Sequence, residues 1–227
     1  DLNAPMASWH GVTVNDSGRV TAISLNNNNL KGALPNLNLP ELLELVLANN
    51  TVRDTMPPLS ALRKLQFLDL TNNQIDGELP NFNLPSLTTL RLANNRFEGQ
   101  LQDYQNMPGL RTLILSGNRL TGGLPDFSNL RNLFTLILSD NNLDGPLVDF
   151  MNLPNLITLD LHGNAFILGV PQYGRSNDLF FLDVSENQLT DAIPTFSRLV
   201  LLETLKLNDN KFTGNFPNLG ALQNLAE

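Results

Sequence analysis

The stretch Leu110-Arg-Thr-Leu-Ile-Leu-Ser-Gly-Asn-Arg-Leu120 decides the fold, because its pattern recurs along almost the whole chain. The form is apolar-x-x-apolar-x-apolar-x-x-Asn-x-apolar, and nine copies begin at Val20, Leu42, Leu65, Leu87, Leu110, Leu133, Leu156, Leu179 and Leu202. Successive copies are 22 or 23 residues apart, and a tenth begins at Leu225. Such a fixed period is typical of a solenoid, in which each coil packs on its neighbours. The 227 residues are therefore expected to form one solenoid rather than two domains.

Each copy begins with a short segment that alternates like a strand. In the quoted copy, Leu113 and Leu115 point to one face, whereas Thr112, Ile114 and Ser116 point to the other. Three-residue strands that recur in the same direction are stable only when they pair side by side. The pattern predicts a parallel sheet with one strand from each coil.

An asparagine follows every predicted strand. The column consists of Asn28, Asn50, Asn73, Asn95, Asn118, Asn141, Asn164, Asn187 and Asn210. A buried carboxamide offers two donors and an acceptor, which can satisfy backbone groups where the chain turns away from the sheet. We interpret this column as structural.

The second half of each repeat carries turn signals and an aromatic column. Gly-x-Leu-Pro occurs at Gly32–Pro35, Gly77–Pro80 and Gly122–Pro125, where glycine permits a tight bend and proline follows an extended piece. The column contains Leu37, Leu59, Phe82, Tyr104, Phe127, Phe150, Tyr173, Phe196 and Leu219. It predicts a stacked spine along the convex side, so most aromatic residues have a packing role.

These repeats resemble leucine-rich repeats, and the Leu-x-Gly-x-Leu/Ile-Pro half most resembles the plant-type class of receptor-kinase ectodomains and polygalacturonase inhibitors. The resemblance covers residues 20–227 and implies an α/β-type repeat solenoid: a right-handed superhelix with a parallel concave β-sheet and a largely irregular or 3-10 convex side. Residues 1–19 are expected to form an N-terminal cap. Similar repeats also occur in protist surface antigens and some bacterial proteins.

The segment Ser8-Trp-His-Gly-Val-Thr-Val14 resembles the N-terminal cap of the same family. In the family, a Trp-x-Gly-Val segment lies between two paired cysteines. Val14 occupies the place of the second cysteine, and Pro5, Met6 and Ala7 fill the region of the first. The cap disulfide is therefore missing from this chain.

Composition and charge exclude several classes of function. The chain has no apolar run near 18 residues and thus no predicted membrane span. A net charge of −8 argues against binding to nucleic acid. With no cysteine and only His10 and His162, most metalloenzyme chemistry is excluded, and no cofactor is expected. Since the sequence begins at Asp1 without a leader, we expect a mature product or an excised fragment.

The family resemblance implies non-enzymatic binding of a protein or peptide on the concave sheet. An extracellular or cell-surface location is expected, although the absence of cysteine also fits a bacterial or cytosolic protein. The candidate ligand-binding residues, chosen from the outward positions of the strands, are Phe67, Asp69, Arg91, Ile114, Ile137, Asp160, His162, Phe181, Asp183 and Lys206. A co-receptor or a second copy of the chain is a further candidate partner.

Charge is unevenly distributed over the predicted concave face. Repeats six to nine carry six acidic residues against Lys206, a net −5, whereas the first five repeats are balanced. The acidic part favours a ligand with a basic segment, although acidic residues also serve solubility. Ile114 and Ile137 predict an exposed apolar patch beside it.

Other interpretations of the same face stay open. The principal alternative is a structural or adhesive surface protein that binds nothing specific. The pair Asp160 and Asp183 beside His162 also suggests acid–base chemistry, and Asp160, Asp183 and Glu186 suggest a cation site. The evenly spaced Thr89, Thr112, Thr135 and Thr158 suggest a hydroxyl ladder for a regular lattice such as ice, but threonine also favours strands.

Overall fold

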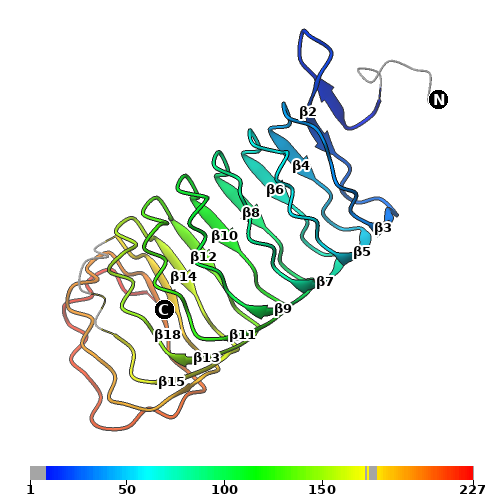
Figure 1. Ribbon diagram of the computed structural model, residues 1–227. Coiled ribbons are helices and arrows are strands. Elements are labelled where there is room, and N and C mark those ends of the chain that lie inside the picture. Colours follow the sequence, from blue (N-terminus) through cyan, green and yellow to red (C-terminus); the bar gives the residue numbers. More distant parts are fainter. Residues whose placement is uncertain (1–8, 172, 174–177, 227) are drawn as a thin grey trace.

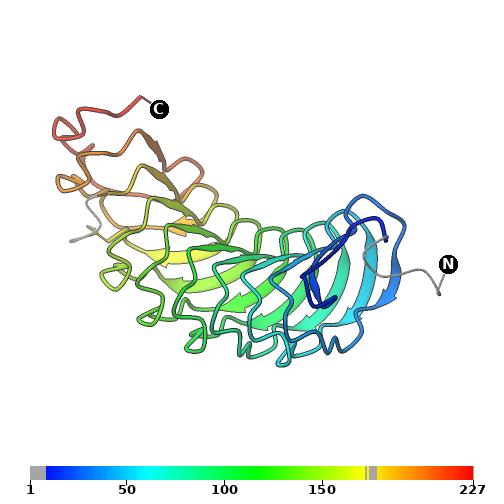
Figure 2. The same ribbon diagram turned by 90° about the horizontal axis from the view of Figure 1, so that it is seen from above.

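A computed structural model describes residues 9–171, 173 and 178–226 of the chain. These residues form a solenoid of parallel strands that bends into an arc, with the described termini at opposite ends (Figures 1 and 2). The expected fold class is confirmed. Among the described residues there is no helix that is long and apolar enough to cross a membrane.

The concave sheet has ten strands in the described part of the chain, one from each coil and one that precedes the first coil. They are β1 (Val12–Val14), β2 (Val20–Ser24), β4 (Glu44–Val46), β6 (Phe67–Asp69), β8 (Thr89–Arg91), β10 (Thr112–Ile114), β12 (Thr135–Ile137), β14 (Thr158–Asp160), β16 (Phe181–Asp183) and β18 (Thr204–Lys206), adjacent in that order. β1 is antiparallel to β2, and all other neighbours are parallel. Of the cap-like segment, Ser8 lies outside the described residues, as do Pro5, Met6 and Ala7.

A second sheet, which the sequence reasoning did not anticipate, follows the asparagine turns. Its eight strands are β3 (Lys31–Ala33), β5 (Thr51–Thr55), β7 (Gln74–Glu78), β9 (Arg96–Gln100), β11 (Arg119–Gly122), β13 (Asn142–Pro146), β15 (Ala165–Leu168) and β17 (Gln188–Leu189), paired in parallel. The signal was present but weak: in β9, Phe97 is buried while Arg96 and Glu98 are exposed. The glycine in most of these strands has a positive φ, which reads as a turn in the sequence.

The convex side consists of turns. Within one coil, Leu62 N–H donates to Leu59 O at 2.9 Å and Leu65 N–H donates to Leu62 O at 3.0 Å. These i-to-i+3 bonds are the kind used by a 3-10 helix, but they form successive turns. The convex side is thus largely irregular, as expected.

The asparagine column joins successive coils. Asn95 Nδ2 donates to Leu70 O of the preceding coil at 3.0 Å and to Leu92 O of its own coil at 3.1 Å. Its Oδ1 accepts from Ile75 N–H of the preceding coil at 3.0 Å. The other internal asparagines repeat this arrangement, although Asn118 and Asn164 are less buried.

The aromatic column forms a buried spine, as expected. Leu59 through Phe196 are buried, and only the end members Leu37 and Leu219 are half-buried. The Phe127 and Phe150 rings stack at 6.4 Å, and Phe150 stacks on Tyr173 at 6.0 Å. Six members have a φ between 46° and 53°, which is strained for bulky residues. Burial of each large apolar side chain offsets this local cost.

The two tyrosines of the spine provide a stability test. Their hydroxyl groups are buried and have no hydrogen-bond partner among the described residues, and burial raises the pKa of both phenols. Removing an unsatisfied buried hydroxyl should be favourable. We expect Tyr104→Phe to raise the free energy of unfolding by about 1 kcal/mol, measured by urea denaturation. The reverse change, Phe127→Tyr, should lower it, and a stabilising effect there would contradict this account.

A second test separates the buried asparagine column from its exposed neighbours. Asn95→Ala leaves buried carbonyl and N–H groups unpaired and should lower the free energy of unfolding by about 2–4 kcal/mol. The adjacent Asn94 is exposed, has a φ of 54°, and donates only to Asn72 Oδ1 at 2.7 Å. Because Gly117 and Gly163 occupy the same column, Asn94→Gly should change stability by about 0.5 kcal/mol or less. Equal effects of the two variants would refute a special role for the buried column.

Candidate functional site

The register of the concave sheet arranges the candidate residues in rows. Cα pairing joins Asp69 to Arg91, Arg91 to Ile114, Ile114 to Ile137, Ile137 to Asp160, Asp160 to Asp183, and Asp183 to Lys206. Phe67 and Phe181 lie in the adjacent outward row, together with the four threonines between them. The candidate residues therefore share one face.

Three of the candidates form what we call the N-terminal cluster: Phe67, Asp69 and Arg91. The Arg91 guanidinium lies 5.5 Å from the centre of the Phe67 ring and 3.9 Å from Asp69 Oδ2. Asp69 Oδ1 accepts from Thr71 N–H at 2.9 Å, which fixes the carboxylate where β6 ends. This cluster borders a shallow hollow of about 320 Å³.

Three others repeat this arrangement five strands further on, in what we call the C-terminal cluster: Phe181, Asp183 and Lys206. Lys206 Nζ lies 5.8 Å from the centre of the Phe181 ring and 3.9 Å from Asp183 Oδ2. Asp183 Oδ1 accepts from Ser185 N–H at 3.0 Å and from Ser185 Oγ at 2.6 Å. The hollow beside it is larger, about 670 Å³, and includes His162 and Glu186 in its lining. The outward positions of these residues predict that they share a face, but the sequence period does not reveal that the two clusters match.

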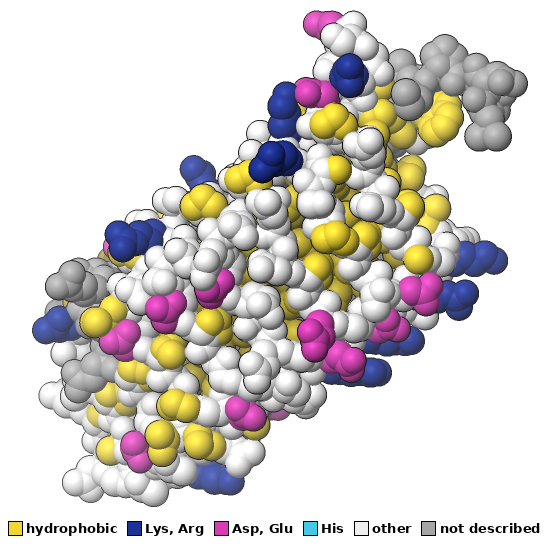
Figure 3. Space-filling model, in the orientation of Figure 1, with side chains coloured by type: hydrophobic (Ala, Val, Ile, Leu, Met, Phe, Trp, Pro, Cys, Tyr) yellow, Lys and Arg dark blue, Asp and Glu magenta, His cyan; other side chains and the backbone are white. Residues whose placement is uncertain are grey.

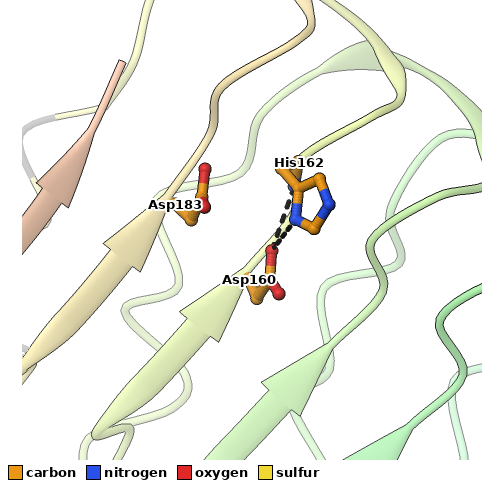
Figure 4. A group of neighbouring side chains, drawn as sticks. All are labelled: Asp160, His162 and Asp183. Atoms are coloured by element: carbon orange, nitrogen blue, oxygen red, sulfur yellow. Dashed lines mark hydrogen bonds and ion pairs between the residues drawn. The ribbon is translucent and has the colours of Figure 1, made fainter. Parts of the chain in front are cut away.

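Asp160 and His162 add a histidine–carboxylate group to the C-terminal cluster. His162 Nδ1 lies 2.8 Å from Asp160 Oδ1, and Asp183 extends from the neighbouring strand toward the same space (Figure 4). Nε2 of His162 lies 3.5 Å from Asp140 Oδ2. Asp183 was expected to be an outward ligand residue, but its side chain is only 7% exposed because Ser185, Lys206 and the neighbouring coils cover it.

The electrostatic surroundings favour the protonated form of His162. Burial of the imidazole opposes protonation, but the hydrogen bond to Asp160 and the charges of Asp160, Asp140 and Asp183 outweigh it. These groups hold the pKa of His162 above its ordinary value of 6.5. The imidazolium can then neutralise part of the acidic region.

The centre of the face is less apolar than the sequence suggested. Ile114 and Ile137 are half-buried rather than fully exposed, because long neighbours flank them. Phe134 is also half-buried and lies 5.9 Å from the Arg111 guanidinium. Phe180 is 43% exposed at the start of its strand. The apolar surface is thus divided between the row of isoleucines and the edge of the sheet.

Acidic groups outnumber basic ones around the C-terminal cluster. Asp183 and Glu186 line the hollow together with one lysine, Lys206, and His162 in the same lining is paired with Asp160 and Asp140. Figure 3 shows a face of the molecule on which no histidine is visible; there too, basic side chains lie mainly along the edges and acidic ones extend across the surface. Glu186, which was grouped with Asp160 and Asp183 as a cation ligand, is exposed and lies outside the tight group that these two form with His162.

The charge state of His162 generates a test. A group whose pKa is raised by folding stabilises the folded protein. This contribution is complete at pH values below the pKa of the group in the unfolded chain, and it is lost as the pH rises through the pKa in the folded protein. The difference in unfolding free energy between the wild type and His162→Asn should therefore be largest at acidic pH and decrease above pH 6.5. Urea denaturation at several pH values, in buffer that contains a metal chelator, measures this difference in unfolding free energy.

An NMR titration provides the direct control for the His162 test. In the wild type, the imidazole of His162 should titrate with a midpoint above 6.5, and Asp160→Asn should lower that midpoint. A His10→Asn variant assigns the two histidine signals. A midpoint at or below 6.5 for His162 would contradict the electrostatic account.

Comparisons with known proteins identify the repeats. The family model for Leucine Rich repeats (2 copies) matches residues 63–106, and the one for Leucine Rich Repeat matches residues 109–130. A search of curated protein sequences finds no significant match.

Three solved structures illustrate the similarity. The Arabidopsis receptor kinase HAESA ectodomain, in complex with an IDA peptide hormone ligand, is 28% identical with a TM-score of 0.88, and the match covers 99% of this chain and 40% of that one. A TDR receptor is 31% identical, with a TM-score of 0.76 and coverages of 88% and 41%. A plant ice-binding protein is 26% identical, with a TM-score of 0.75 and coverages of 93% and 79%.

The chain thus spans about two fifths of the length of the receptors that it matches. The repeats matched by the family models, the asparagine column and the parallel solenoid all lead to the same identification. The chain carries leucine-rich repeats and is similar to plant receptor ectodomains, and its sequence contains no cysteine.

Proposed function

We propose that this protein is a non-enzymatic recognition module that binds a protein or peptide across its concave sheet, between the N-terminal and C-terminal clusters. The observation that carries this proposal is the repetition of one arrangement at two places. In each cluster an aspartate and a phenylalanine from one strand hold a cation of the next strand. Paired sites of this kind suit one extended ligand that contacts both.

The spacing of the clusters indicates the length of such a ligand. Five strand spacings separate them, or about 24 Å at 4.8 Å per strand. An extended peptide rises about 3.3 Å per residue, so about seven residues would span the distance. Between the clusters this segment would lie over Ile114, Ile137 and the threonine row.

Charge suggests the direction of binding. The acidic groups near the C-terminal cluster favour a basic segment of the ligand there, and Ile114 and Ile137 offer apolar contacts nearer the middle. The solved HAESA complex, in which a related ectodomain holds a peptide hormone, supports a ligand of this class. By the same analogy we propose an extracellular or cell-surface location, and a co-receptor or second copy as additional partner.

A capture experiment tests the proposal. The double variant Ile114→Asp/Ile137→Asp places two charges in the proposed contact and should abolish capture of a partner from the native extracellular fluid. Ile167→Asp is the matched control, because Ile167 is an exposed isoleucine, 41% accessible, on the second sheet. All three proteins must give the same circular dichroism spectrum.

Loss of the partner in the double variant, with retention in the control, is the expected result. Equal capture by all three proteins would overturn concave binding and favour a structural or adhesive surface protein.

Ice binding is a second candidate, favoured by the in-register threonine row and the similarity to the plant ice-binding protein. The curvature of the sheet in Figure 2 opposes it, since a lattice plane is flat. Thermal hysteresis of the purified chain, without any captured partner, would select this function.

A further inference from the structure

We propose that Asp160, His162 and Asp183 form a binding site for a divalent transition-metal ion, with Zn²⁺ as the favoured occupant. Among the described residues, this is the group of three whose potential ligand atoms all lie within 4.8 Å of one another. The inference concerns these side chains alone and does not depend on the proposed protein or peptide ligand.

The fold brings the three side chains together. Asp160 and Asp183 are Cα partners on the adjacent strands β14 and β16, and both point to the concave face. His162 follows Asp160 by two residues and therefore returns to the same face (Figure 4). No large rearrangement of the backbone is needed to bring two carboxylate oxygens and one imidazole nitrogen to one ion.

Backbone hydrogen bonds hold the carboxylates in place. Asp160 Oδ1 accepts from His162 N–H at 3.2 Å, and Asp183 Oδ1 accepts from Ser185 N–H at 3.0 Å. Such support orients ligand groups before a metal arrives and raises affinity. Asp183 Oδ2 forms an ion pair with the ammonium of Lys206 at 3.9 Å, a distance beyond that of a hydrogen bond.

The charges provide an independent reason for a cation. Two carboxylates directly opposite each other on neighbouring strands repel, and the side chain of Asp183 is almost fully buried. Asp140 adds a third negative charge on the far side of His162. A dication that binds as His162 loses its proton supplies one positive charge more than the imidazolium that it replaces, and so balances this excess more completely.

The donor set selects the type of metal. One imidazole nitrogen and two carboxylate oxygens suit Zn²⁺ and related ions, whereas Ca²⁺ and Mg²⁺ prefer oxygen alone. Three protein ligands also leave a coordination position free. It would face the hollow of about 670 Å³, where water or an acidic group of another molecule has access.

The N-terminal cluster serves as an internal control. Asp69 has the same backbone support as Asp183, through Thr71 N–H at 2.9 Å. The strand that precedes it, however, carries Val46 as its Cα partner, and Ala48 stands two residues further on. The two positions that supply Asp160 and His162 in the C-terminal cluster are thus apolar in this one.

Calorimetric titration of Zn²⁺ into the full chain, freed of metal with a chelator and then dialysed, tests the proposal. We expect one ion per chain. Asp160→Asn, His162→Gln and Asp183→Asn should each weaken binding at least about tenfold, whereas Asp69→Asn should leave it unchanged. Circular dichroism checks the fold of each variant.

A second experiment introduces the ligand residues at the N-terminal cluster, which we call the transplant. It does not depend on variants that remove ligands from the C-terminal cluster. Val46→Asp/Ala48→His should reproduce the three-ligand group beside Asp69 and raise the stoichiometry from one ion to two. NMR of the wild type supplies a third measurement, since Zn²⁺ should perturb the imidazole nitrogens of His162 and leave those of His10 unchanged.

Several results would overturn the site. These are the absence of Zn²⁺ binding at micromolar concentrations, binding that survives loss of His162, and a perturbation confined to His10. If Asp183→Asn fails to fold, the Zn²⁺ stoichiometry of the transplant and the NMR spectrum of the wild type still test whether the site binds the ion.

Discussion

The structure depends on the hydrogen bonds that the buried asparagines make between successive coils. Each internal carboxamide donates to carbonyls of its own coil and of the preceding one, and accepts an N–H from the preceding coil. A strand of three residues has too few backbone bonds to keep its register alone. The column therefore fixes where every coil turns, and with it the alignment of all the others.

The alignment of successive coils places residues at equivalent repeat positions next to one another on one surface. Once coils are in register, residues one repeat apart become neighbours at strand spacing, so chemistry that is dispersed along the chain gathers on the sheet. The same constraint explains why the Phe–Asp–cation arrangement could arise twice. Both clusters use the same outward positions, and each gains its cation from the following coil.

The clusters differ in what the preceding coil contributes. Next to Asp69 the preceding coil places Val46 and Ala48 at the two matching positions, whereas next to Asp183 it supplies Asp160 and His162. This difference adds two groups to the cation–aromatic contact: a second carboxylate and a histidine whose pKa the neighbouring carboxylates raise. Different residues at two equivalent repeat positions are thus enough to make the two clusters of one sheet chemically distinct.

Much of the fold could be predicted from the sequence, because leucines, asparagines and the aromatic column recur at a fixed period. The concave sheet, its outward rows and the buried spine follow from that period alone. The second sheet was missed because residues such as Gly99, with a φ of 77°, look like turns in the sequence.

The candidate site was only partly predictable. The sequence by itself determined which residues share the concave face, since alternation and period fix their rows. Only the tertiary structure decided that Asp183 is buried, that Ile114 and Ile137 are half-buried, and that His162 rather than Glu186 joins the two aspartates. The physical reason is that burial and side-chain contact depend on how neighbouring coils cover each position, which a repeat pattern does not specify.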